Sequence, residues 1–185
     1  MRKIALKNLA AALDGLEDPV VGFFDETAPQ TTANTVRVWS FGKSRIVKNT
    51  SPYRANTFGF YTLNGTSVLS FQERSRKENV IDVLEAIREE NPDQDILLVL
   101  DNFPSHTAKK TQARADELGI TLVFLPPYSP HLNPIELVWK SLKRHVSTVF
   151  AESEEHFKSL IKTEFYELSA QSSFASKWHG TFLTK

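Results

Sequence analysis

The chain has 185 residues, 41% apolar and 24% charged, which is enough to bury the core of one domain, and we expect residues 1–185 to form a single domain. Its 22 basic and 22 acidic residues cancel, which excludes a strongly basic chain and leaves only local basic surfaces for nucleic acid. The absence of cysteine excludes thiolate chemistry and sulfur-ligated zinc sites.

The first 17 residues predict an amphipathic helix. Apolar residues recur there at helical spacing, with Arg2, Lys3 and Lys7 on the other side. The segment lacks the apolar centre and cleavage site of a signal peptide. No stretch approaches the roughly 18 apolar residues of a membrane span, so we expect no membrane partner and a cytoplasmic or nucleoid location.

The apolar run 20–24 predicts a buried strand that delivers an acid at its carboxyl end. Asp25 and Glu26 follow it, and the residues alone leave open which one points into a site. Segments 57–63 and 66–71 flank Asn64-Gly65, a strong two-residue turn signal. The first three strands should therefore form an antiparallel portion of the sheet.

Residues 79–91 predict a helix that ends before Pro92, and residues 107–118 predict another that Gly119 closes. Between them lies the longest aliphatic run, residues 96–100, which suits a central strand covered on both faces. Asp101-Asn102 follows this run, either as part of a site or simply as a turn.

A third acid follows the strand predicted at 121–125. A stiff proline-rich loop, 126–132, leads to Asn133 as helix cap and to Pro134 in the first turn. Glu136 then lies in that first turn, where it serves a site or merely completes a capping box. The tail, residues 151–185, carries apolar residues at helical spacing, which favours helices packed on the sheet over a partner-binding face.

The three acids Asp25, Asp101 and Glu136 could converge outside the carboxyl ends of neighbouring strands. Clustered carboxylates repel one another unless a hard cation such as Mg²⁺ offsets their charge. Two such ions, about 3.5–4 Å apart, can promote an in-line displacement at a phosphodiester.

Three sequence blocks resemble the catalytic blocks of the mariner-superfamily and related insertion-sequence transposases, over roughly residues 20–150. The most specific block runs from Leu125 to Glu136 and includes Trp139, and 34 residues separate its Glu136 from Asp101. The other blocks are Phe23-Phe24-Asp25-Glu26 and Leu98-Val99-Leu100-Asp101-Asn102 with His106, and the pattern Arg37-x-Trp39 is also similar.

The resemblance implies an α/β, ribonuclease-H-like fold: a mixed sheet of three antiparallel and two parallel strands, flanked by helices. It implies that Asp25, Asp101 and Glu136 are catalytic and bind Mg²⁺ or Mn²⁺, with two ions expected. The implied reaction is phosphodiester hydrolysis at transposon ends followed by 3′-hydroxyl strand transfer into target DNA, carried out by a homodimer. His106 and His131 are expected to form local hydrogen bonds instead of binding metal.

Basic residues on either side of these blocks are candidates for contacts with the DNA backbone. They fall into three clusters, each of which could also be ordinary solvated surface. The candidates are Arg37, Lys43, Arg45, Lys109, Lys140, Lys143 and Arg144.

Only about 20 residues precede the first strand, so no helix-turn-helix domain of the kind that reads transposon ends is expected. A separate DNA-binding subunit or a missing N-terminal domain would have to supply that function. Two alternatives share the fold: a nuclease without strand transfer, and a catalytically silent DNA-binding or dimerisation remnant. A receiver-like phosphoacceptor module is disfavoured, because 75 residues separate Asp25 from Asp101.

Overall fold

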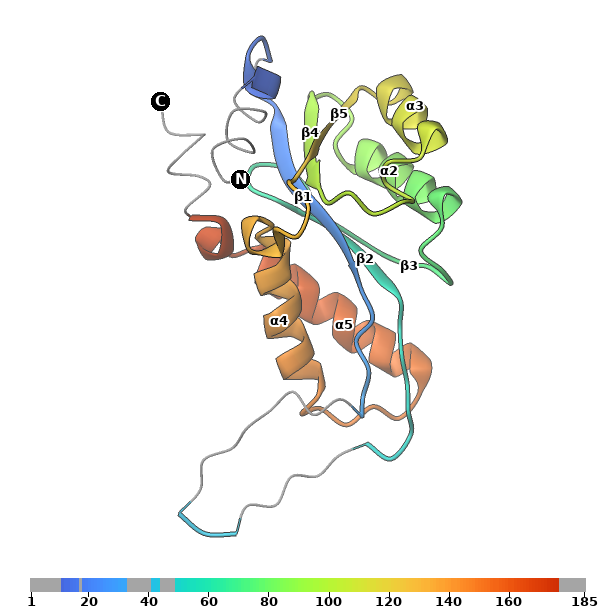
Figure 1. The fold of residues 1–185 in the computed structure, drawn as a ribbon. Coiled ribbons are helices and arrows are strands. Elements are labelled where there is room, and N and C mark those ends of the chain that lie inside the picture. The colour runs from blue at the N-terminus through green and yellow to red at the C-terminus, as the bar shows by residue number, and fades with distance from the viewer. Residues whose placement is uncertain (1–10, 17, 33–40, 44–48, 177–185) are drawn as a thin grey trace.

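The computed structural model describes residues 11–16, 18–32, 41–43 and 49–176. A five-stranded mixed sheet forms its centre (Figure 1). The elements in chain order are β1 (Val20–Thr27), β2 (Thr57–Thr62), β3 (Val68–Phe71), α2 (Lys77–Glu90), β4 (Ile96–Leu100), α3 (Lys109–Glu117), β5 (Ile120–Phe124), η1 (Pro130–Leu132), α4 (Ile135–Val146), α5 (Glu154–Ser169) and η2 (Ser172–Ala175).

The strands lie in the order β3-β2-β1-β4-β5. β1 pairs antiparallel with β2, and β2 with β3, whereas β4 pairs parallel with both β1 and β5. This arrangement confirms the expected sheet of three antiparallel and two parallel strands. It also aligns the carboxyl ends of β1, β4 and β5 along one edge of the sheet.

Two helical layers cover the sheet: α2 and α3 lie on one face, and α4 and α5 on the other (Figure 1). Side chains alternate between the faces along each strand. On β1, Val21 and Phe23 pack into the α4 and α5 layer, whereas Val20 and Phe24 pack into the α2 and α3 layer. The uninterrupted aliphatic run of β4 follows from this arrangement, because its residues are buried on both faces.

The first strand is longer than its apolar run. The apolar run stops at Asp25-Glu26, where the strand is predicted to end, but β1 continues to Thr27 and Asp25 pairs with Gly59 of β2. Pairing with β2 supplies backbone hydrogen bonds to these polar residues, so hydrophobicity alone does not mark the end of the strand. The helix boundaries shift in a similar way: α2 begins at Lys77, and α3 runs from Lys109 to Glu117.

The two ends of the chain are described only in part. Of the helix predicted at 1–17, residues 1–10 and 17 lie outside the described residues, and residues 11–13 are helical. In the tail, α5 buries Phe157, Ile161 and Phe165 in the core, as predicted for helices packed on the sheet. Residues 177–185 are not described. Within the part that is described, no helix combines the length and apolarity needed to cross a bilayer.

Candidate active site

Asp25 faces the α4 side of the sheet. It follows Phe23 by two residues on β1, so its side chain projects on the same face, and its cross-strand partner is Gly59. Gly59 lies against the indole of Trp139 on α4, because a Cβ built there would stand 2.5 Å from that ring. The missing side chain lets α4 approach the sheet next to Asp25.

Glu136 is the second residue of α4, one turn before Trp139. The prediction that Asn133 caps this helix is wrong: Pro134 occupies the capping position, without a side-chain hydrogen bond. Asn133 is buried, and its amide donates to the carbonyl of Phe24, 3.1 Å away. This bond ties the start of α4 to the backbone of β1 immediately before Asp25.

Asp101 follows the last residue of β4. Its Oδ1 accepts a hydrogen bond from the backbone amide of Phe103 at 3.0 Å and lies 2.7 Å from Nδ1 of His106. Both interactions use the same oxygen, which leaves Oδ2 for a ligand.

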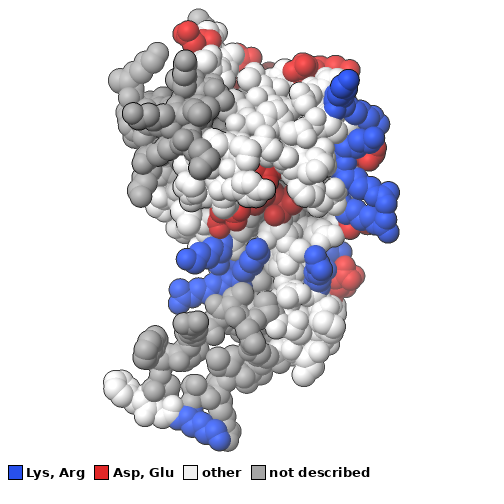
Figure 2. All heavy atoms as spheres, viewed as in Figure 1, with Lys and Arg blue, Asp and Glu red and all other residues white. Residues whose placement is uncertain are grey.

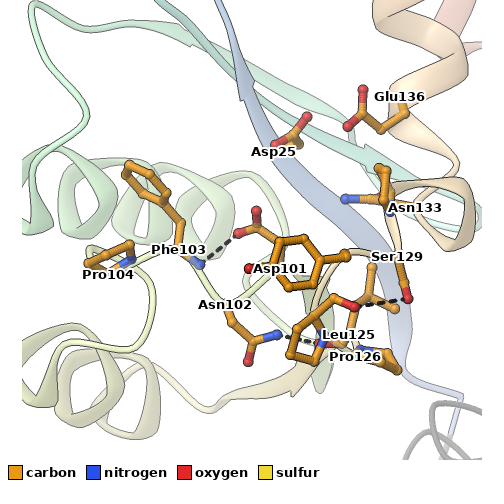
Figure 3. A pocket seen from close by; sticks show the side chains of 13 residues that line it. Asp25, Asp101, Asn102, Phe103, Pro104, Leu125, Pro126, Ser129, Asn133 and Glu136 are labelled. Atoms are coloured by element: carbon orange, nitrogen blue, oxygen red, sulfur yellow. Dashed lines mark hydrogen bonds between the residues drawn. The ribbon is translucent and has the colours of Figure 1, made fainter. Parts of the chain in front are cut away.

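The three acids line one pocket of about 470 Å³. Figure 3 shows their carboxylates turned toward a common space from β1, the end of β4 and the start of α4. The remaining lining residues come from the segment after β4 and from the loop between β5 and α4: Asn102, Phe103, Pro104, Leu125, Pro126, Pro127, Tyr128, Ser129, Pro130 and Asn133. The structure therefore brings together the three acids that the sequence predicts to be catalytic.

The charge of Asp25 is unfavourable in this setting. Burial and the neighbouring carboxylate of Glu136 raise its pKa from 3.8 to about 7, and Asp101 adds a smaller repulsion. Asp101 differs, because the hydrogen bond from His106 holds its pKa below the usual value. The positive groups around the pocket thus do not fully offset the negative charge of its three carboxylates.

His106 joins Asp101 to Glu26. It is almost fully buried, and its Nε2 lies 3.3 Å from a carboxylate oxygen of Glu26. Burial lowers the pKa of His106, but the hydrogen bonds with Asp101 and Glu26 outweigh it and raise the pKa to about 9. A protonated imidazole between two carboxylates is the result, consistent with the local hydrogen bonding expected of this residue. Glu26 projects on the opposite face of β1 from Asp25 and does not line the pocket.

The pocket suits a hard divalent cation by its chemistry. Among the described residues, no group of three or more His, Asp and Glu side chains is arranged to hold a metal ion as it stands. The donor set nevertheless consists of carboxylate oxygens, which Mg²⁺ and Mn²⁺ prefer. A cation between Asp25 and Glu136 would also offset the repulsion that raises the pKa of Asp25.

The predicted DNA contacts that the structure describes, Lys43, Lys109, Lys140, Lys143 and Arg144, do not line the pocket. Arg37 and Arg45 are not among the described residues, and Lys43 and Lys109 are exposed. Lys140, Lys143 and Arg144 continue along α4 from Glu136, with the two lysines on the same side of the helix as the acid. Figure 2 shows acidic side chains in the middle of this face of the molecule, with Lys and Arg side chains below them and along the right edge.

Sequence reasoning missed two features of the site. The bond from Asn133 to β1 was hidden, because an Asn before Pro and a first-turn Glu is typical of a helix cap. The link from His106 to Glu26 joins residues 80 positions apart in the chain, which no local pattern reveals. The only sequence feature that pointed to His106 was its place beside Asp101-Asn102, in a block that resembles the transposase family.

Comparison with known proteins identifies the family of this chain and supports its fold. The model of the DDE superfamily endonuclease family matches residues 20–158. No curated protein matches the chain. Among solved structures, the mariner Mos1 paired-end complex with Mg aligns with a TM-score of 0.70 at 17% identity, covering 98% of this chain and 59% of that one.

The Mos1 transposase catalytic domain, solved with Raltegravir and Mg, aligns with a TM-score of 0.64 at 16% identity, covering 98% of this chain and 92% of that one. These alignments confirm the ribonuclease-H-like fold. This chain spans about 60% of the Mos1 chains in their transposon-end complexes. Because the family model covers most of the sequence, including all three acids, the chain belongs to the DDE superfamily endonucleases.

Proposed function

We propose that the chain is the catalytic domain of a DNA transposase. One observation carries this proposal: Asp25, Asp101 and Glu136, from three separate elements, line a single pocket. Family membership and the alignment with Mos1 transposase support it. The reaction is phosphodiester hydrolysis at the transposon ends, followed by attack of the freed 3′-hydroxyl on target DNA.

In this proposal, Asp25, Asp101 and Glu136 hold a pair of Mg²⁺ or Mn²⁺ ions. When bound, the ions would activate the attacking oxygen and stabilise the leaving oxygen. Asp25 would have to be ionised to hold a cation, and its raised pKa means that cation binding would compete with protonation near neutral pH. His106 keeps Oδ1 of Asp101 occupied, so that Oδ2 faces the pocket.

DNA is the proposed partner, in the cytoplasm or nucleoid. Lys140, Lys143 and Arg144 extend from Glu136 along α4 and would contact the phosphate backbone, with Lys43, Lys109, Arg37 and Arg45 as further candidates. Since two transposon ends must be joined, the active form is a homodimer. A separate DNA-binding subunit or a further N-terminal domain would recognise the ends.

The test is cleavage and joining of supercoiled plasmid and short duplex DNA with Mg²⁺ or Mn²⁺. We expect metal-dependent products that fall by about 100-fold or more in Asp101→Ala and in Glu136→Ala, because each loses a carboxylate ligand. Asp116→Ala removes an exposed acid on α3, outside the pocket, and should leave the products unchanged.

The products distinguish the alternatives. Joined DNA supports the transposase, and cleaved DNA without joined products supports a nuclease without strand transfer. Activity that persists in both pocket variants would show that these carboxylates are not catalytic.

A further inference from the structure

One wall of the pocket is apolar and partly aromatic. Beside the three carboxylates it is lined by Phe103, Pro104, Pro126, Pro127, Tyr128 and Pro130. Coordination of a cation does not use these side chains. At about 470 Å³ the pocket falls within the range of about 300–1,000 Å³ that is usual for sites holding an organic group.

Tyr128 lies on the proline-rich loop between β5 and α4, with its side chain in solvent. It is 99% exposed, and its φ of 56° lies in the left-handed region that a bulky residue rarely adopts. Two prolines precede it, and the hydroxyl of Ser129 donates to the carbonyl of Pro127 at 3.3 Å. Backbone strain kept in place by its surroundings is characteristic of ligand-binding sites.

Phe103 supplies a second ring on the side of Asp101. It is 45% exposed, and its backbone amide bonds the Asp101 carboxylate (Figure 3). The edge of its ring packs against His106, with centroids 5.8 Å apart. Both rings are therefore carried by segments that line the pocket together with the three carboxylates.

We propose that Tyr128, together with Phe103, forms a stacking site for an unpaired base of the DNA strand being cut, adjacent to the scissile phosphodiester. This inference rests on the proposed function. An exposed aromatic face binds the face of a base without selecting its sequence. The faces of a paired base are covered by its neighbours, so the base must leave the duplex stack to reach these rings.

The choice of a base over an apolar protein segment follows from the neighbouring charges. The same pocket holds three carboxylates whose proposed role is to bind cations at a phosphodiester, which places a nucleotide within reach of the aromatic wall. A ring presented on a proline-rich loop also loses little conformational freedom when it stacks.

The experiment compares two short DNA duplexes that differ at one position. One carries an unpaired 2-aminopurine, and the other carries the same base fully paired. Both are titrated with the protein in Ca²⁺, a hard cation with oxygen ligands. Affinity is measured by fluorescence anisotropy, and stacking by quenching of the 2-aminopurine emission.

We expect wild type to bind the unpaired duplex more tightly and to quench it. Tyr128→Leu should weaken that binding by about 5- to 100-fold and abolish the quenching, with no change for the paired duplex. Tyr128→Phe keeps the ring and should behave as wild type. Tyr166→Leu removes a half-exposed aromatic on α5, outside the pocket lining, and is the matched control.

Each other outcome overturns a specific claim. If Tyr128→Leu binds and quenches like wild type, or loses affinity for both duplexes equally, the stacking site is refuted while the proposed function stands. If wild type binds neither duplex or does not prefer the unpaired one, the inference fails, whereas the proposed function is decided separately by the cleavage and joining assay. Thermal unfolding of each variant identifies any loss of folded protein.

Discussion

Asp25 and Asp101 share one pocket, but their surroundings move their pKa values in opposite directions. Burial and the Glu136 carboxylate destabilise the ionised form of Asp25. The hydrogen bond from His106 stabilises the ionised form of Asp101. Ionised Asp25 therefore lowers the stability of the metal-free fold, and a bound divalent ion would remove this loss.

Asp25→Asn should accordingly stabilise the metal-free protein in a pH-dependent way. The folded pKa of about 7 lies above the unfolded value of about 3.8, so the unfolded state releases its proton first and wild type loses stability as pH rises between them. The variant removes this loss. Its gain in unfolding free energy should be small near pH 4, grow to about 2–4 kcal/mol and level off above pH 7.

Urea denaturation with a chelator present, from pH 4.5 to 8.5, measures this gain. Asp116→Asn, an exposed acid on α3, should show no such trend. A gain for Asp25→Asn that is constant with pH would contradict the raised pKa.

His106 orients Asp101, and its two nitrogens can be tested separately. His106→Asn keeps a donor near the position of Nδ1, toward Asp101, and loses the contact with Glu26. His106→Leu loses both contacts. We expect His106→Leu to weaken Mn²⁺ binding by about 10- to 100-fold, as is typical when a hydrogen-bond partner of a metal ligand is removed.

His106→Asn should retain most of the Mn²⁺ affinity in calorimetric titration. An equal loss of Mn²⁺ affinity in the two variants would mean that the hydrogen bond to Asp101 does not determine metal binding. Unfolding curves establish the folded fraction, since both substitutions alter a buried residue.

At the scale of elements, the contact between α4 and β2 places the third acid. Trp139 is buried over Gly59, and Gly59 pairs with Asp25, so the helix carries Glu136 to the pocket only if this contact is close. The hydrogen bond from Asn133 to the Phe24 carbonyl holds the start of α4 against β1. The position of Glu136 therefore depends on packing, and helix propensity alone would not determine it.

Gly59→Ala should disturb both stability and the site. The added Cβ would stand 2.5 Å from the Trp139 ring, so either this ring or α4 must shift away from the sheet. We expect the unfolding free energy to fall by about 1–3 kcal/mol, and Mn²⁺ affinity to fall with it because Glu136 is displaced. Denaturation and metal titration measure the two effects.

Gly42→Ala is the matched control for this substitution. A Cβ at Gly42 meets no atom within 4 Å, so neither stability nor metal affinity should change. Full metal affinity in a destabilised Gly59→Ala would separate the packing of α4 from the position of Glu136.

At the scale of the whole molecule, the sheet topology brings residues that are far apart in the chain to one edge of the sheet. β1 and β4 are neighbours and parallel, so Asp25 and the residue after β4 reach the same edge of the sheet, although the hairpin and α2 lie between them in the chain. The loop after β5 then crosses this edge and starts α4 there. Pockets at the carboxyl ends of strands are the general consequence of such topology.

Most of the strands, the turn between β2 and β3 and the family could be predicted from the sequence, because each has a local pattern. The aliphatic run of β4 and the Asn64-Gly65 turn identify strands through local patterns, and the string from Leu125 to Glu136 is long enough to identify a family. Gly119 closes α3 with a φ of 64°, as its position predicts. These features depend on residues close together in the chain.

The sequence by itself determined the order of the elements, the three acids and the family, because periodicity, turn chemistry and motif spacing are local properties. Only the tertiary structure decided that Asp25 and not Glu26 enters the pocket, that Asn133 binds β1 instead of capping α4, and that His106 connects Asp101 to Glu26. The alternating faces of β1 and contacts between distant segments fix these roles, and neither is encoded at a single position of the chain.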